Sequence, residues 1–230
     1  MENHKAVTLL HLLLFVFGFS MAMAQRTQGE VWPAEKARSW YSEQEWLAGA
    51  NFNPSTAINQ IEMWQEFSFD PVTIDRELRW AADIGFNTMR VYLHYLVWAR
   101  SPRGLKNRMD RFLAIADSHD IKVMFVLFDD VWGRDPNLGE QPAPVPGVHN
   151  SGWVQSPGHD QRTDRALYPV LKAYTQDLLR RFDGDGRVLM WDLYNEPGNG
   201  KNPPSSTLPL LKNVVSWTRE VNPSQPLTIG

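Results

Sequence analysis

The sequence comprises 230 residues, with 23 Lys and Arg, 26 Asp and Glu, and a formal net charge of −3. This balance provides no basic surface of the kind that binds a phosphate backbone, so nucleic acid is not an expected partner. The 43% hydrophobic and 21% charged residues are typical of a globular protein. Because the chain has no Cys, disulfides, thiolate nucleophiles and cysteine-ligated metal sites are excluded.

The N-terminus predicts a secretory signal peptide over residues 1–24. A short charged start is followed by an apolar run over residues 6–19 and by Ala22-Met23-Ala24, which favours cleavage before Gln25. The alternative is a membrane anchor, but the apolar run is shorter than the ~20 residues that span a bilayer. We therefore expect a secreted or periplasmic protein with no membrane association after cleavage, and an N-terminal extension over residues 25–46.

Strand and helix patterns then alternate along the chain. Strand-like runs begin near Gly49, Asn87, Lys122, Val188 and Pro226, and amphipathic helical patterns lie between them. Such alternation predicts an α/β fold with a parallel sheet. The third interval is longer than the others by roughly thirty residues. This insertion, residues 129–163, follows a strand, where α/β enzymes build their binding sites, although a disordered surface loop is the alternative.

The segment Trp191-Asp192-Leu193-Tyr194-Asn195-Glu196-Pro197 contains the strongest candidate for chemistry. Glu196 follows an apolar strand directly and precedes a Pro that stops the backbone. We expect burial near Trp191 and Tyr194 to raise its pKa, as a general acid requires. An exposed Glu in a turn is the alternative interpretation.

Four motifs in order resemble the retaining glycoside hydrolases with (β/α)₈ barrels, most nearly the cellulase-like family of endoglucanases and mannanases. They are GANFNPSTAINQIEMW, GFNTMRVYLHYLVW, KVMFVLFDD and WDLYNEPGN, and the resemblance covers residues 47–230. It implies a TIM barrel, a carbohydrate substrate and no cofactor. It also implies that Glu196 is the general acid/base, that Asn195 binds the sugar 2-hydroxyl, and that Arg90 helps to hold the nucleophile.

Alternation along residues 89–94 supports a functional role for two side chains independently. Arg90 and His94 share one face of the predicted strand, which would line the barrel interior. For His94, a buried structural histidine is the equally weighted alternative. We interpret Asp129 and Asp130, after the next strand, as a loop-initiating pair in preference to a catalytic pair.

Tryptophan side chains are numerous, with ten in the chain. Trp98, Trp132 and Trp153 lie in predicted loops at the strand ends, and flat aromatic surfaces suit the apolar faces of sugars. Trp132 is therefore a candidate substrate contact. We expect Trp80 and Trp217, on predicted helices, to be core residues.

One of the two carboxyl groups needed for retaining hydrolysis is missing. In the resembling family the nucleophile is a Glu after the seventh strand, whereas the fifth predicted strand here starts at Pro226. After Glu196 the only carboxylate in the chain is Glu220. It lies on a predicted helix, where we expect it to pair with Arg219 or Lys212. The sequence therefore predicts a barrel truncated after about strand five, inactive on its own.

Two alternatives remain open. Five parallel strands also suit a doubly wound α/β domain that binds a ligand, although the chain has none of the motifs typical of nucleotide binding or serine hydrolysis. The alternative function is that of a non-catalytic carbohydrate-binding α/β domain. No metal-ligand motif is present, and the sequence distinguishes neither the polysaccharide nor the oligomeric state.

Overall fold

The computed structural model describes residues 29–133, 135–199 and 203–230. Its centre is one parallel sheet of five strands in the order β1-β2-β3-β4-β5. The strands are β1 (Gly49–Phe52), β2 (Thr88–Tyr92), β3 (Lys122–Val126), β4 (Val188–Asp192) and β5 (Leu227–Thr228). Each begins within one residue of the start predicted from the sequence.

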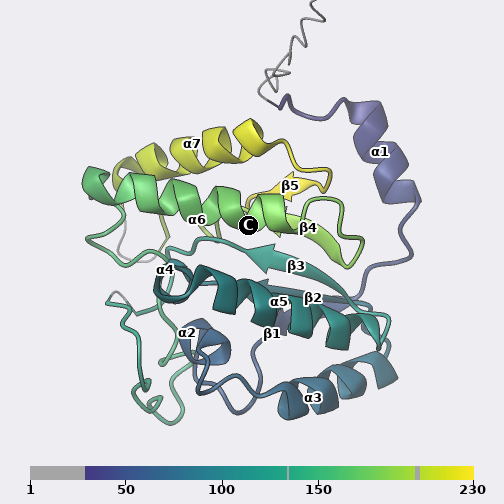
Figure 1. Ribbon diagram of the computed structural model, residues 1–230, viewed down its shortest axis with the longest axis horizontal. Coiled ribbons are helices and arrows are strands. Elements are labelled where there is room, and N and C mark those ends of the chain that lie inside the picture. The colour runs from purple at the N-terminus through teal and green to yellow at the C-terminus, as the bar shows by residue number, and fades with distance from the viewer. Residues whose placement is uncertain (1–28, 134, 200–202) are drawn as a thin grey trace, which may run out of the picture.

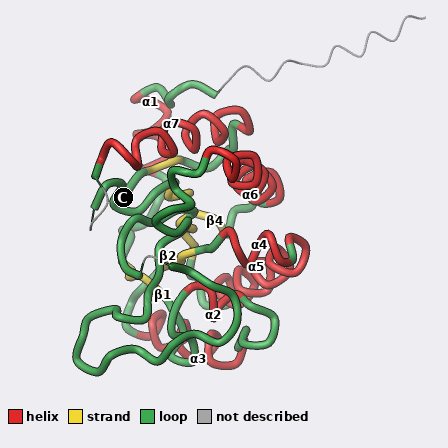
Figure 2. Tube along the Cα trace, turned by 90° about the vertical axis from the view of Figure 1, so that its left-hand side faces the viewer, coloured by secondary structure: helices red, strands yellow, loops and turns green. Residues whose placement is uncertain are grey.

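Helices connect the strands and cover one side of the sheet (Figure 1). They are α1 (Ala34–Ser42), α2 (Gln60–Trp64), α3 (Pro71–Asp83), α4 (Tyr95–Arg100), α5 (Pro102–Asp117), α6 (Tyr168–Arg181) and α7 (Pro204–Val221), with a 3₁₀ turn at Arg165–Leu167. Figure 2 shows α3, α5, α6 and α7 in an arc around the strands.

The strand order distinguishes a barrel arrangement from a doubly wound sheet. In a doubly wound sheet the order reverses at a switch point, so helices cover both faces. Here each strand pairs with the next one along the chain, and no reversal occurs among the five. The alternative of a doubly wound domain is therefore wrong.

The two faces of the sheet differ in burial. The outer face, against the helices, has one aligned row of core side chains: Phe52, Val91, Phe125 and Trp191. The neighbouring row on the inner face is partly exposed and mixed in polarity: Asn51, Arg90, Met124 and Met190. Burial of the outer row provides the hydrophobic driving force, and the inner face is left to position polar groups.

Local signals in the sequence explain where α3 begins and ends. Asp70 caps α3 through hydrogen bonds from the backbone N–H groups of Val72 and Thr73, with Pro71 at the first helical position. After the helix, Gly85 adopts φ 96°, a left-handed conformation that glycine reaches without strain.

The insertion over residues 129–163 packs against the strand ends. Asp129 forms an antiparallel bridge with Ser156, and Gly133 forms a parallel bridge with Val154. Arg162 is buried and pairs with Asp130, with 3.3 Å between Nη1 and Oδ1. The described part of the insertion is thus ordered by strand-like pairing and by a buried ion pair, which contradicts the disordered alternative.

The expected signal peptide lies outside the described residues. Within the ranges that the structure describes, no helix has the length and apolar character needed to cross a membrane.

Candidate active site

Polar side chains gather where β2, β3 and β4 end. Arg90 on β2 donates from Nε to Oδ2 of Asp192 at 3.0 Å, and from Nη1 to Oδ1 of Asn51 at 3.2 Å. Its Nη1 also donates to the Tyr92 hydroxyl. Burial alone lowers the pKa of Arg90, but the hydrogen bond to Asp192 and nearby acidic groups raise it. The guanidinium is therefore a fixed cation on the inner face, as alternation along β2 predicts for Arg90.

Asn195 is buried and held by hydrogen bonds from both ends of its side chain. Its Oδ1 accepts from Nη2 of Arg90 at 2.7 Å, and its Nδ2 donates to Oδ1 of Asp129 at 2.8 Å. The backbone N–H donates to the Phe128 carbonyl at 2.8 Å. The residue predicted to bind a sugar hydroxyl is thus rigidly oriented beside Arg90.

Glu196 differs from the prediction in its burial. Its side chain is exposed, and the carboxylate accepts a hydrogen bond from Nδ2 of Asn199. The expected cover is engaged elsewhere, since Trp191 packs on Phe125 and the Tyr194 hydroxyl donates to Asp130. The expectation of a buried Glu196 is therefore wrong, because β4 ends at Asp192 and the turn that follows directs the side chain outward.

The backbone of Glu196 has φ 44°, in the left-handed region that non-glycine residues rarely adopt. Its N–H donates to the Gly230 carbonyl at 3.1 Å, and Gly198 donates to Oδ2 of Asp130 at 2.8 Å. These bonds hold the turn on both sides of Glu196. Strain of this kind persists only where the surroundings enforce it, and it is often found at functional sites.

Asp129 and Asp130 have roles that their positions in the sequence did not reveal. Asp130 is fully buried and accepts hydrogen bonds from Tyr194, Gly198 and the Thr207 hydroxyl, besides pairing with Arg162. The Asp130 carboxylate therefore forms hydrogen bonds to the insertion, to the turn around Glu196 and to α7. Burial raises the pKa of Asp129 to about 7.

His94 does not line the site. Because β2 ends at Tyr92, the alternation does not extend to residue 94, and His94 instead caps α4. Its Nδ1 accepts from the N–H of Leu96 at 3.1 Å, so Nε2 carries the proton and donates to the Gln155 carbonyl at 2.8 Å. The ring is fully buried, and burial lowers its pKa to about 4. The buried ring, bonded within the protein through both nitrogens, fits the structural alternative and not a substrate contact.

The tryptophans divide into two groups. Trp132, at φ 81°, packs edge-on against Trp153 with 5.4 Å between ring centroids, and Trp153 packs against Tyr92 at 5.6 Å. Both rings are partly exposed beside the strand ends, where the candidate substrate contacts were expected. Trp98 instead donates to Asp177 on α6 at 2.7 Å, within the helix layer.

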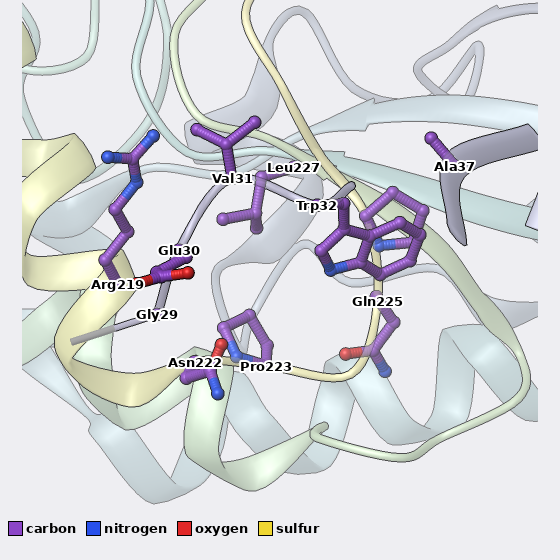
Figure 3. Close-up of a pocket in the computed structure, with 11 residues that line it drawn as sticks. Gly29, Glu30, Val31, Trp32, Ala37, Arg219, Asn222, Pro223, Gln225 and Leu227 are labelled. Atoms are coloured by element: carbon purple, nitrogen blue, oxygen red, sulfur yellow. The ribbon is translucent and has the colours of Figure 1, made fainter. Parts of the chain in front are cut away.

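A pocket of about 300 Å³ lies at the other end of the sheet (Figure 3). It is formed by the N-terminal segment around Trp32 and by the connection from α7 to β5, with Asn222 and Leu227 in its wall. That connection leads into the start of a strand, so this pocket is separate from the polar side chains at the strand ends. In the described ranges, no three His, Asp or Glu side chains gather as a metal site would require.

No protein-family model and no curated protein sequence matches this chain. Solved structures do. An endo-β-1,4-mannanase from Thermotoga petrophila matches with a TM-score of 0.52 and 15% identity, over 83% of this chain and 43% of that one. GH5_18 from Streptomyces cattleya, in complex with GlcNAc, matches with a TM-score of 0.51 and 15% identity, over 79% and 44%.

An endo-1,4-β-mannanase from Rhizomucor miehei matches with a TM-score of 0.50 and 16% identity, over 77% of this chain and 56% of that one. The fold is that of part of a TIM barrel, similar to the barrels of these glycoside hydrolase structures. The chain spans about half the length of the solved structures that it matches. In barrels of this kind the active site lies at the carboxyl ends of the strands, which is the end that carries Arg90, Asn195 and Glu196.

Proposed function

We propose that this chain contributes the acid/base half of the active site of a retaining glycoside hydrolase acting on β-linked oligo- or polysaccharides. Glu196 is the general acid/base, Asn195 contacts the sugar, and Arg90 orients Asn195. The observation that carries the proposal is the 2.7 Å hydrogen bond from Arg90 to Asn195, which fixes the residue next to Glu196 at the active end of a glycoside hydrolase fold.

The exposure of Glu196 fits this role. A general acid must reach the glycosidic oxygen, and the strained turn presents the carboxyl outward from the strand end. The partly exposed Trp132 ring is the proposed platform for an apolar sugar face.

The second carboxyl group is proposed to come from residues beyond these 230. Glu220 is unsuited to the task, because it pairs with Lys172 at 2.7 Å and accepts from Gln176 at 2.8 Å between α6 and α7. Its partners are thus not Arg219 or Lys212, as the sequence suggested. We also propose that residues 1–24 direct export and that the mature chain begins at Gln25.

Hydrolysis tests the proposal. Wild type and Glu196→Gln, each in the longest natural polypeptide that contains this chain, are assayed by reducing-end release from β-1,4-mannan, β-glucan and xylan oligosaccharides. We expect Glu196→Gln to lose 100-fold or more of kcat, in the range of about 10²–10⁴ for general acid/base groups. Equal rates for the two proteins would refute the role of Glu196. Sugar binding without cleavage by either protein would favour a non-catalytic binding domain.

A further inference from the structure

Asp129 lies between the ends of β3 and β4 and is buried with 1% of its surface exposed. Its backbone is fixed by the insertion, since its N–H donates to the Ser156 carbonyl at 2.7 Å and its carbonyl accepts from the Ser156 N–H at 3.0 Å. Its Oδ1 accepts from the Val131 N–H at 2.9 Å and from Nδ2 of Asn195 at 2.8 Å. The insertion therefore fixes the position of the Asp129 carboxyl, which accepts a hydrogen bond from Asn195.

The side-chain amide of Asn195 lies between a basic and an acidic side chain. The cationic Arg90 donates to its oxygen, and the Asp129 carboxyl accepts from its nitrogen. Rotating the amide by 180° would set Oδ1 against a carboxylate and Nδ2 against a guanidinium, which can only donate. Asp129 and Arg90 thus specify one of two orientations that are otherwise nearly equal in shape.

From this geometry we propose that Asp129 is a positioning residue that acts through Asn195, by holding its amide in the orientation that meets the sugar. Nδ2 carries two hydrogens, and Asp129 accepts one of them, so that the second can be presented to a sugar hydroxyl. The proposal rests on the function proposed above for Asn195.

Burial makes Asp129 respond to pH near neutrality, with several charged groups around it. Arg90 and Tyr92 face it from β2, Asp192 lies on β4, and Asp130 is adjacent in the chain. Burial outweighs the hydrogen bonds and raises the pKa of Asp129 to about 7. Its Oδ2 is buried with no hydrogen-bond partner among the described residues, so it is the oxygen that can take up the proton. Oδ1 can accept from Asn195 in either protonation state.

Nuclear magnetic resonance of the Asn195 side-chain amide in the 230-residue chain tests the contact without any assay of activity. The signals are assigned by their loss in Asn195→Ala. We expect two inequivalent Nδ2 protons, of which the one bonded to Asp129 is protected from exchange, with shifts that titrate with a midpoint near pH 7. In Asp129→Ala the protection should be lost. In Asp129→Asn, which can still accept at this position, the amide should stay ordered while the titration disappears.

Asp177→Asn is the matched control, because the Asp177 carboxylate, like that of Asp129, accepts two hydrogen bonds, but it lies on α6 and is bonded to Trp98 and Lys106. It should leave the Asn195 signals and their titration unchanged. Asn195 signals that stay protected in folded Asp129→Ala, or that keep the same titration midpoint in Asp129→Asn, would overturn the proposal.

A double-mutant cycle in the hydrolysis assay tests the path through Asn195. We expect Asp129→Ala to lower kcat/KM by about ten- to a hundredfold. In a protein that already carries Asn195→Ala, the same substitution should have little further effect. The conservative variant Asp129→Asn should keep most of the wild-type activity. An equal loss from Asp129→Ala in both backgrounds would contradict action through Asn195. If no protein hydrolyses any glycoside, the proposed function fails, whereas the resonance experiment still decides the contact.

Discussion

Two adjacent residues after β4 have opposite environments. Asn195 is buried and bonded at both ends of its side chain, whereas Glu196 is exposed on a left-handed backbone. The sequence located both, because residues after parallel strands meet at one edge of a sheet. It could not predict the exposure of Glu196, since alternation ends with the strand. The role of Asp129 was also missed, because a single Asp in a loop carries no periodic signal.

The raised pKa of Asp129 should make the stability of the protein depend on pH. Its pKa is about 7 in the folded protein, against 3.8 for an unperturbed Asp, so between these values the folded state holds a proton that the unfolded state has lost. Its stabilising contribution is therefore full below pH 4 and lost as the pH rises through 7. We expect Asp129→Asn to gain stability relative to wild type between pH 4 and 8, measured by urea unfolding. A constant difference across this range would show that the pKa of Asp129 is not raised.

The long, periodic elements were the most predictable ones. All five strands were found, as were the four long helices, because their apolar patterns extend over several residues. The short helices α2 and α4 were not found, since five or six residues are too few to show a helical period. Trp80 was wrongly assigned to the core: it is 54% exposed, because it lies about 200° around α3 from the buried Leu78.

His94, at the start of α4, should make stability depend on pH in the opposite direction to Asp129. Its pKa falls from 6.5 to about 4 on folding, because burial disfavours the charged ring. Its contribution is present above pH 6.5 and lost as the pH falls through 4. We expect the stability advantage of wild type over His94→Asn, in urea unfolding, to grow between pH 4 and 7. An advantage that shrinks over that range would contradict the neutral buried ring.

The buried pair of Arg162 and Asp130 should anchor the insertion. Arg162→Met leaves a buried carboxylate without this cation, and we expect a loss of about 3 kcal/mol in the free energy of unfolding. The control is Arg181→Met, whose 3.7 Å pair with Asp110 is about half exposed on both sides and should cost less than about 1 kcal/mol. Equal losses for the two variants would show that the buried pair is no anchor.

At the scale of the whole molecule, the sheet has one buried and one partly open face. The outer row packs under the helices, whereas Arg90, Met124 and Met190 on the inner face remain partly exposed. The order of the four motifs favoured a barrel, but the sequence left a doubly wound sheet open, and only the observed strand order decides between them. Five strands of a barrel fold place the acid/base candidate and its positioning residues together. We accordingly propose that Glu196 serves a retaining glycoside hydrolase.

The most direct measurement uses Glu196→Ala in the longest natural polypeptide that contains this chain, with an aryl β-glycoside whose leaving group needs no protonation. In a retaining enzyme the second carboxylate still forms a glycosyl-enzyme, which then accumulates because no general base activates water. Azide needs no such base, so we predict faster turnover with azide and a β-glycosyl azide as the product. Wild-type turnover without azide, or an α-glycosyl azide, would contradict the assignment.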